Sequence, residues 1–230
     1  MYKILLSEPI DEAGMEVLSD KAEVVVSPSP SEEKVVSLMQ DADALILRTS
    51  TKINREMIEK AKKLKVISRT GGGLNNVDIA AATDNDVVVC GVKGPQDRTV
   101  AEHTVILIGT LAKQLPYLDE QVKAGNFKSR YEYKAVSLRG KRVGLIGLGR
   151  IGLHVGRICS SAFEMEVWAY DPYISPKDLE GTGICLKESV DEVITEADFL
   201  SLHVPSNEKT KGMMGKERFK LMKPSAFIIN

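Results

Sequence analysis

Several features are scarce in this chain of 230 residues, and each scarcity excludes a class of protein. Its three cysteines, Cys90, Cys159 and Cys185, are odd in number, widely spaced and set among apolar residues. We therefore expect neither a disulfide framework nor a zinc site, and no other metal site either, and we expect each thiol to be a small buried hydrophobic group. Charge of one sign is not in excess, since 32 Asp and Glu stand against 31 Lys and Arg without a basic run, and this argues against nucleic-acid binding.

Long hydrophobic runs are also missing. No window approaches the length of a membrane span, and the beginning MYKILLSEPIDEAG lacks the long apolar core of a signal peptide. We therefore expect a cytoplasmic protein that does not act at a membrane. Hydrophobic residues make up 43% of the chain and charged residues 27%, which is typical of a globular protein with room for two modest domains.

The most informative stretch begins at residue 143. The apolar run VGLI (143–146) is short enough to be a strand buried on both faces of a parallel sheet, and GLGRIG (147–152) follows at once. Apolar residues then recur at helical spacing, at Ile151, Val155, Ile158, Cys159 and Ala162. The glycines therefore lie on a strand-to-helix turn, where Gly147 permits the tight turn, Gly149 lets a pyrophosphate approach the backbone, and Gly152 allows the helix to pack on the strand.

An acidic residue completes this pattern. Residues 167–170 (VWAY) predict a second strand that ends on Asp171, nineteen positions after Gly152. A carboxylate at that place accepts hydrogen bonds from an adenosine ribose and repels a 2′-phosphate, so we expect NAD rather than NADP. Arg150 starts the helix, where free N–H groups and the helix dipole favour phosphate, and the pyrophosphate is its expected partner, with a 2′-phosphate as the alternative.

The first hundred residues alternate strands with helices. The predicted strands are 2–7, 24–26, 44–47, 64–68 and 87–90, and the predicted helices are 12–19, 31–40, 54–63 and 78–83. Ser31, Asn54 and Asp78 are the expected N-caps. This order predicts a small flavodoxin-like parallel sheet, whose ligands gather at the carboxyl ends of the strands.

Two of those strand ends carry polar groups. Arg48 follows the third strand, and RTGGGLNNVD (69–78) follows the fourth. Three consecutive glycines expose backbone N–H groups that suit a carboxylate, and a plain flexible turn is the alternative. For Arg48 and Arg69, an ion pair at the surface or between domains is as consistent with the sequence as ligand contact.

The remainder predicts a second α/β unit. Residues 91–97 are expected to cross between domains, and 99–115 to form a long helix buried between domains or subunits, followed by an irregular segment at 116–137. Further strands are expected at 183–186, 199–202 and 226–229, with a helix at 188–196. The strand 199–202 ends at His203, Val204 and Pro205, which we expect to face the nicotinamide half of the crevice.

These residues together resemble the D-2-hydroxyacid dehydrogenases, and among them the phosphoglycerate dehydrogenase-like branch. The matching pieces, in the family's order over essentially the whole chain, are LILRTSTKI, GGGLNNVD, TVAEHT, SLRGKRVGLIGLGRIG, YDPYIS, LSLHVPSNEKTKGMM and LMKPSAFIIN. The resemblance implies an α/β protein with a flavodoxin-like substrate (lid) domain at 1–98. It also implies a Rossmann-type NAD-binding domain at 99–230 that is incomplete at its C-terminus. The implied reaction is reversible hydride transfer between NAD and a 2-hydroxy acid, in a homodimer formed through 99–137.

The resemblance also assigns residues to a site. Its cofactor contacts, together with the strand-end residues that flank Val204, are Gly72, Gly147, Gly149, Arg150, Ile151, Gly152, Asp171, His203, Val204 and Pro205. The substrate carboxylate falls on Gly72 and Gly73, with Arg48 near the distal end of the substrate. Asn75 stands where the family commonly has Asp, a change that alters a loop hydrogen bond without removing the grip.

No catalytic residue is expected within the chain. The family's catalytic arginine, glutamate and histidine follow the position of Asn230, and we do not expect His103, His154 or His203 to replace them. We expect turnover of 2-oxo acids only with a continuation of about a hundred residues. A non-catalytic NAD-binding or interaction protein, and an NAD-binding subunit completed by a partner chain, are the alternatives. Phosphoglycerate, glycerate, hydroxypyruvate and larger 2-hydroxy acids all remain possible substrates.

Overall fold

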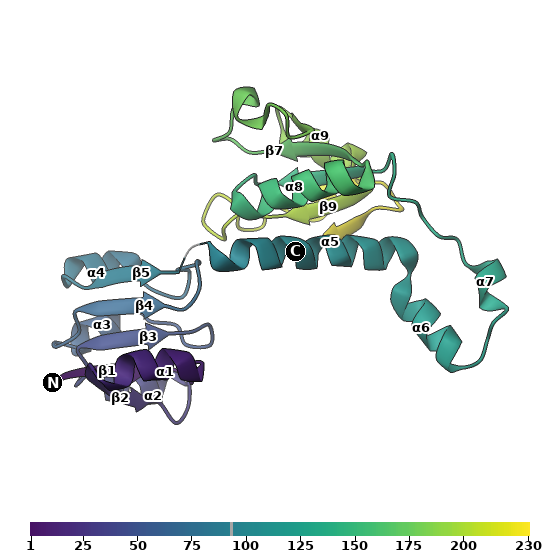
Figure 1. Ribbon diagram of the computed structural model, residues 1–230. Coiled ribbons are helices and arrows are strands. Elements are labelled where there is room, and N and C mark those ends of the chain that lie inside the picture. The colour runs from purple at the N-terminus through teal and green to yellow at the C-terminus, as the bar shows by residue number, and fades with distance from the viewer. Residues whose placement is uncertain (93) are drawn as a thin grey trace. The chain divides into compact units, whose positions relative to one another are not determined.

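The computed structural model describes residues 1–92 and 94–230. The chain divides into two compact units, Met1–Gly94 and Pro95–Asn230, and each is built on its own five-stranded parallel sheet (Figure 1). The division lies four residues before the boundary expected between 98 and 99, because helix α5 (Pro95–Lys113) begins earlier than predicted. Proline is favoured at the first helical position, where its missing N–H is not needed. The crossing predicted at 91–97 is therefore helical from Pro95, and Lys93 within it lies outside the described residues.

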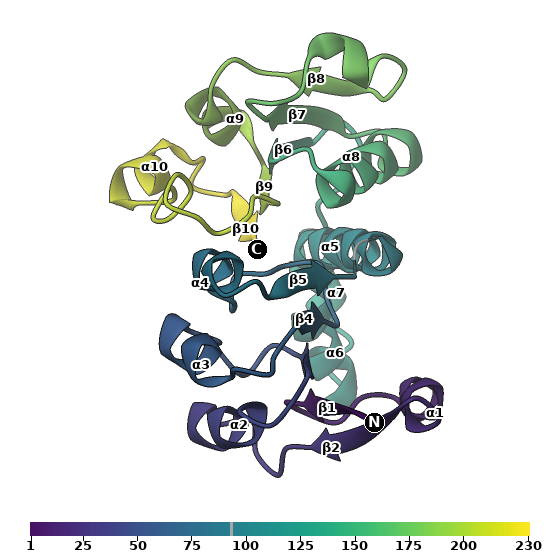
Figure 2. The same cartoon turned by 90° about the vertical axis from the view of Figure 1, so that its left-hand side faces the viewer.

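The first unit contains the predicted flavodoxin-like parallel sheet. Its sheet runs β2-β1-β3-β4-β5, with helix α1 on one face and α2, α3 and α4 on the other (Figure 2). The bounds are β1 Tyr2–Leu6, α1 Glu12–Ser19, β2 Ala22–Val26, α2 Glu32–Met39, β3 Ala44–Leu47, α3 Arg55–Lys60, β4 Val66–Arg69, α4 Ile79–Asp84 and β5 Val88–Gly91. Apolar side chains such as Leu5, Leu45 and Ile67 are fully buried between the layers, as expected for parallel strands covered on both faces.

Two of the three predicted N-cap residues make the expected side-chain hydrogen bond to a helix N–H group. The Asn54 side chain accepts a hydrogen bond from the Met57 N–H at 3.0 Å, and that of Asp78 from the Ala81 N–H at 2.9 Å. Ser31 lies at the N-cap of α2, but its side chain makes no cap hydrogen bond. The prediction for Ser31 was therefore right in position and wrong in chemistry.

The second unit has the strand order β10-β9-β6-β7-β8, with α5 and α8 on one face and α9 and α10 on the other (Figure 2). Its remaining elements are α6 Leu115–Lys123, α7 Ser129–Glu132, β6 Arg142–Ile146, α8 Arg150–Phe163, β7 Glu166–Tyr170, η1 Pro176–Leu179, β8 Ile184–Leu186, α9 Val190–Glu196, β9 Phe199–Leu202, α10 Lys216–Leu221 and β10 Phe227–Ile229. Strand β6 lies at the centre of the sheet, and Val143 and Leu145 are fully buried. The polypeptide turn that follows β6 is therefore held by the most enclosed strand of the unit.

We expected the segment 116–137 to be irregular, and this is only partly correct. Helices α6 and α7 lie within it, and the residues between and after them are irregular (Figure 1). Pro116 lies in the first turn of α6, where proline's fixed φ suits a helix start. An ion pair between Asp119 and Lys123, 2.6 Å apart and four residues from each other, supports the same helix.

The expectation of three buried thiols was wrong for two of them. Cys159 is buried in α8, and burial raises the pKa of its thiol to about 12. Cys90 and Cys185 are exposed, because each lies on the last strand at one edge of its sheet, where alternate side chains point to solvent. Among the described residues, no helix is long and apolar enough to cross a membrane.

Candidate functional site

The turn between β6 and α8 is where the strand ends of the second sheet meet. Strand β6 pairs with β7 on one side and with β9 on the other, so the chain switches direction across the sheet at this point. The Gly147 N–H donates to the Tyr170 carbonyl at 2.9 Å, and the His203 N–H donates to the Ile146 carbonyl at 2.8 Å. These bonds tie the carboxyl ends of all three strands together. In open parallel sheets a ligand crevice forms at such a switch point.

The three glycines of the turn differ in the space around them. Gly147 has φ +96°, and a Cβ there would lie 2.9 Å from the backbone of His203. A Cβ on Gly152 would lie 2.2 Å from the Gly147 carbonyl oxygen, so the helix reaches the turn only because that side chain is missing. A Cβ on Gly149 would meet no atom within 4 Å. The turn is therefore closed on the protein side and open beside Gly149, at the start of α8, where first-turn N–H groups lack helical partners.

Asp171 is tied to the same turn. One carboxylate oxygen, Oδ2, accepts from the Leu148 N–H at 2.7 Å, and the other, Oδ1, accepts from the Tyr173 N–H at 2.9 Å. The carboxylate thus fixes the end of β7 against the glycine turn. Carboxylate oxygens have further lone pairs, so these two bonds leave acceptor capacity for ribose hydroxyls.

Arg150 makes a contact that the sequence analysis did not anticipate. Its Nε lies 2.9 Å from Oδ2 of Asp97, in the first turn of α5. The Arg150 side chain is 56% exposed and that of Asp97 only 19%. The sequence pattern places Asp97 in the segment 91–97 that was expected to cross between domains, so it indicates no partner for Arg150.

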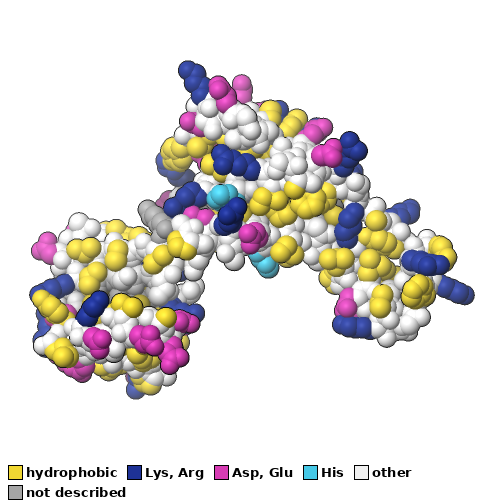
Figure 3. All heavy atoms as spheres, in the orientation of Figure 1, with side chains coloured by type: hydrophobic (Ala, Val, Ile, Leu, Met, Phe, Trp, Pro, Cys, Tyr) yellow, Lys and Arg dark blue, Asp and Glu magenta, His cyan; other side chains and the backbone are white. Residues whose placement is uncertain are grey.

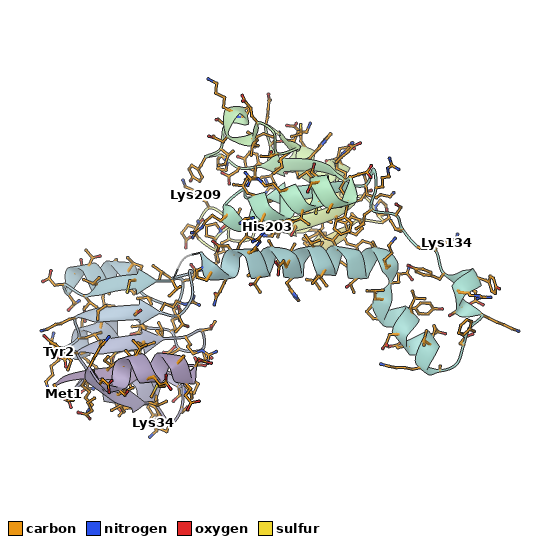
Figure 4. All side chains as sticks on the ribbon, in the orientation of Figure 1. Met1, Tyr2, Lys34, Lys134, His203 and Lys209 are labelled. Carbon is orange, nitrogen blue, oxygen red and sulfur yellow. The ribbon has the colours of Figure 1, made fainter. Side chains whose placement is uncertain are left out.

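His203 lies beside the start of α8, where Figure 4 labels it. Its Nε2 is 3.0 Å from the Ser201 Oγ, and desolvation by burial lowers its pKa to about 4. The imidazole is therefore neutral near pH 7 and supplies no positive charge there. Val204 packs on Gly147, with its Cγ1 3.0 Å from the position a Cβ would take, while Pro205 is exposed and Ile151 is half-buried against the core.

The strand ends of the first unit form a second polar cluster. Arg48 follows β3, and its guanidinium donates to the Pro9 carbonyl at 2.9 Å. Gly72 and Gly73 are exposed in the loop after β4. A Cβ on Gly73 would lie 3.8 Å from a terminal nitrogen of Arg69. The predicted substrate residues therefore all lie at the carboxyl ends of β3 and β4.

Asn76 organises this cluster and was missed by the sequence analysis. Its side-chain oxygen accepts from the Arg69 Nε at 3.0 Å, and its amide nitrogen donates to the carbonyls of Arg48 at 2.9 Å and Thr51 at 2.8 Å. One side chain thereby joins the two loops that follow β3 and β4. Its place directly after Asn75 in the glycine-rich loop gave no signal that separated it from its neighbour.

The predicted site residues fall into both units. Gly72, Gly73 and Arg48 belong to the first unit, and the other predicted cofactor residues surround one turn in the second unit. No cluster of His, Cys, Asp and Glu in the described part of the chain has the arrangement of a metal site. The second unit has a glycine turn with open space beside it, the free N–H groups of the first turn of α8, Arg150, and the Asp171 carboxylate, which can accept hydrogen bonds from a ribose. These groups together suit a dinucleotide.

Comparison with known proteins gives the same assignment. The family model described as D-isomer specific 2-hydroxyacid dehydrogenase, NAD binding domain, matches residues 105–230. The chain is 39% identical over 230 residues to a D-3-phosphoglycerate dehydrogenase of Methanocaldococcus jannaschii, covering 100% of this chain and 44% of that protein. It is 36% identical to the D-3-phosphoglycerate dehydrogenase of Archaeoglobus fulgidus, covering 99% of this chain and 43% of that protein. The chain thus spans less than half the length of these curated relatives.

Solved structures agree with this fold. A D-lactate dehydrogenase from Aquifex aeolicus complexed with NAD and lactic acid superposes with a TM-score of 0.90 at 30% identity, over 99% of this chain and 68% of that one. An acyclic imino acid reductase in complex with NADPH and D-Arg superposes with a TM-score of 0.89 at 27% identity, over 99% of this chain and 73% of that one. Both similarities cover the two units described above.

Proposed function

Because the chain belongs to the D-isomer specific 2-hydroxyacid dehydrogenase family, we propose that it serves NAD-dependent hydride transfer between a 2-hydroxy acid and the corresponding 2-oxo acid. Residues 105–230 are the family's NAD-binding domain. We assign the cofactor contacts to the turn of residues 147–152, together with Asp171 and the strand end at His203, Val204 and Pro205. NAD, when bound, supplies or accepts the hydride.

The observation that carries this proposal is the geometry of the glycine turn. Gly147 and Gly152 are required by close backbone contacts, whereas Gly149 is bordered by open space at the start of α8. A turn needed only for packing gives no reason for a glycine at the open position. The N–H groups of the first turn of α8 would bind the pyrophosphate, and Asp171 would accept hydrogen bonds from the ribose.

The first unit supplies the proposed substrate groups. The exposed backbone of Gly72 and Gly73 would bind the substrate carboxylate, and Arg48 would lie near its distal end. Gly72 would also contact the cofactor. Support comes from the cluster itself, since Asn76 holds the loops after β3 and β4 together and Arg69 lies beside Gly73.

We further propose that the protein is a homodimer formed through the segment 99–137. Apolar side chains are exposed along this segment, as Figure 3 shows for one face, and they include Val100, Ile106, Leu115, Val122, Phe127 and Tyr131. Exposed apolar side chains gathered on one segment are typical of a subunit interface. Light scattering coupled to size-exclusion chromatography should give twice the mass of the chain, and a monomer at micromolar concentration would contradict this part of the proposal.

The cofactor assignment is tested by replacing Asp171 with Ala and titrating NADH. Loss of the ribose acceptor should weaken NADH binding about tenfold, as expected for a charge-assisted hydrogen-bonded group. Asp178→Ala is the matched control, because its carboxylate also accepts a backbone hydrogen bond, from Ser175, but outside the turn. Equal NADH affinity of the wild type and the Asp171 variant would contradict the assignment.

The reaction itself is tested with a panel of 2-oxo acids. In the full-length protein, NADH should be oxidised in their presence, which absorbance of the reduced nicotinamide records. Failure of every 2-oxo acid to consume NADH, with NADH binding intact, would favour a protein that binds the cofactor without turnover.

A further inference from the structure

The contact between Asp97 and Arg150 bears on how this site accepts phosphate. Arg150 is the first residue of α8 and follows Gly149, the glycine with open space beside it. It is therefore the cationic side chain nearest in sequence to the place where we assign the pyrophosphate. In the structure this guanidinium is directed to a carboxylate of α5, since its Nε lies 2.9 Å from Oδ2 of Asp97.

The pair is ionic but not well hydrogen-bonded. Oδ2 of Asp97 is buried from solvent and has no hydrogen-bond partner in the part of the chain that the structure describes, although Arg150 lies next to it. A buried carboxylate oxygen without a hydrogen bond is costly, so this contact is weaker than a bidentate arginine–carboxylate pair. Arg150 retains 56% exposure and is therefore able to turn towards solvent.

The Asp97 carboxylate lies near the start of α8, where a bound anion is favoured. Helix α5 packs along α8, and the first turn of α5 brings Asp97 to the first residue of α8. The start of a helix favours negative charge, and a carboxylate near it takes part of the electrostatic role of a bound phosphate.

We propose that Asp97 is a positioning residue that competes with the pyrophosphate of the dinucleotide for Arg150, and so lowers the affinity of the site for phosphate-bearing ligands. This inference rests on the proposed function, because it requires that NAD binds at the glycine turn. When the dinucleotide binds, Arg150 leaves Asp97 and contacts the phosphate. When the dinucleotide leaves, Asp97 takes Arg150 back.

The test is NADH titration of the Asp97→Asn variant by calorimetry. Removing the carboxylate charge frees Arg150 to contact the pyrophosphate, so NADH should bind about two- to fivefold more tightly, the range expected for a partly exposed ion pair. Asp97→Ser is the second variant, with the same expectation if Asp97→Asn does not fold. Asp119→Asn, on α6, removes an equal charge from an ion pair with Lys123 and should leave the affinity unchanged.

Two further arms separate competition from a structural role. In an Arg150→Gln background, Asp97→Asn should no longer tighten NADH binding, because the guanidinium for which Asp97 and the pyrophosphate compete is absent. Adenosine, which lacks phosphate, should bind wild type and Asp97→Asn equally. Unchanged or weaker NADH binding by Asp97→Asn, the same gain in the Arg150→Gln background, or an equal gain for adenosine or for Asp119→Asn would overturn the inference. Absence of NADH binding by the wild type would instead overturn the proposed function itself.

Discussion

Gly152 is the residue of the turn with the least space. A Cβ there would lie 2.2 Å from a backbone carbonyl oxygen, which cannot move aside as a flexible side chain can. Gly152→Ala should therefore lower the free energy of unfolding by about 2–3 kcal/mol, the upper range for overpacking. Urea denaturation measures this, with Gly149→Ala as the matched control, since its Cβ meets open space and should cost less than about 1 kcal/mol. Equal losses for both variants would show that the two glycines do not differ as described.

His203 makes stability depend on pH. Its pKa is lowered by burial from 6.5 to about 4, so between these values the unfolded chain binds a proton that the folded chain does not. The contribution is fully present above about pH 6.5, and the free energy of unfolding falls as the pH is lowered towards 4, by at most about 3 kcal/mol.

Urea denaturation at about pH 7.5 and at about pH 4.5 measures this fall in the free energy of unfolding. The difference should shrink in His203→Gln and persist in His103→Gln, whose side chain is exposed. A wild-type difference that His203→Gln leaves unchanged would mean that other groups titrate.

The residues around the glycine turn were predictable from the sequence, because few backbone conformations join a buried strand to a helix through this glycine spacing. The spacing from Gly147 to Asp171 predicted which residues meet, and the structure brings them to one turn. The partners of Arg150 and Asn76 were not predictable. Their contacts depend on Asp97 and on the Arg48–Thr51 loop, which are distant in sequence and carry no periodic signal.

At the scale of elements, the helix caps give a direct comparison. Asn54 caps α3 through its side chain, whereas Ser31 occupies the N-cap of α2 without a side-chain hydrogen bond. Asn54→Ala should lower the free energy of unfolding by about 1 kcal/mol, and Ser31→Ala by less than about 0.5 kcal/mol. Urea unfolding of both variants decides this, and a loss for Ser31→Ala as large as that for Asn54→Ala would contradict the assigned caps.

Strands were easier to predict than the connections between them. Buried parallel strands leave continuous apolar runs such as ALIL of β3, and these appear in the sequence at the right places. Helix α6 was not predicted, and the first turn of α5 was assigned to a crossing because it contains glycine, proline and polar residues. In both helices a proline belongs to the helix start. The exposure of Cys90 and Cys185 depends on which strands lie at the sheet edges, and strand order is a property of the tertiary fold.

For the whole molecule, the two sheets have related but distinct orders. The first sheet runs β2-β1-β3-β4-β5 and the second β10-β9-β6-β7-β8, and in each the residues with site chemistry follow the carboxyl ends of strands. Alternating strand and helix patterns were sufficient to predict the strands of both sheets. Family membership then rests on the match of residues 105–230, while the activity of the whole protein rests on the proposals above.

Calorimetric titration of this chain with NADH and NADPH shows whether the turn of residues 147–152 binds NAD. We expect saturable binding of about one NADH per chain, and weaker binding of NADPH because the Asp171 carboxylate repels a 2′-phosphate. Absence of saturable NADH binding, or tighter binding of NADPH than of NADH, would show that this turn is not an NAD site of the kind proposed.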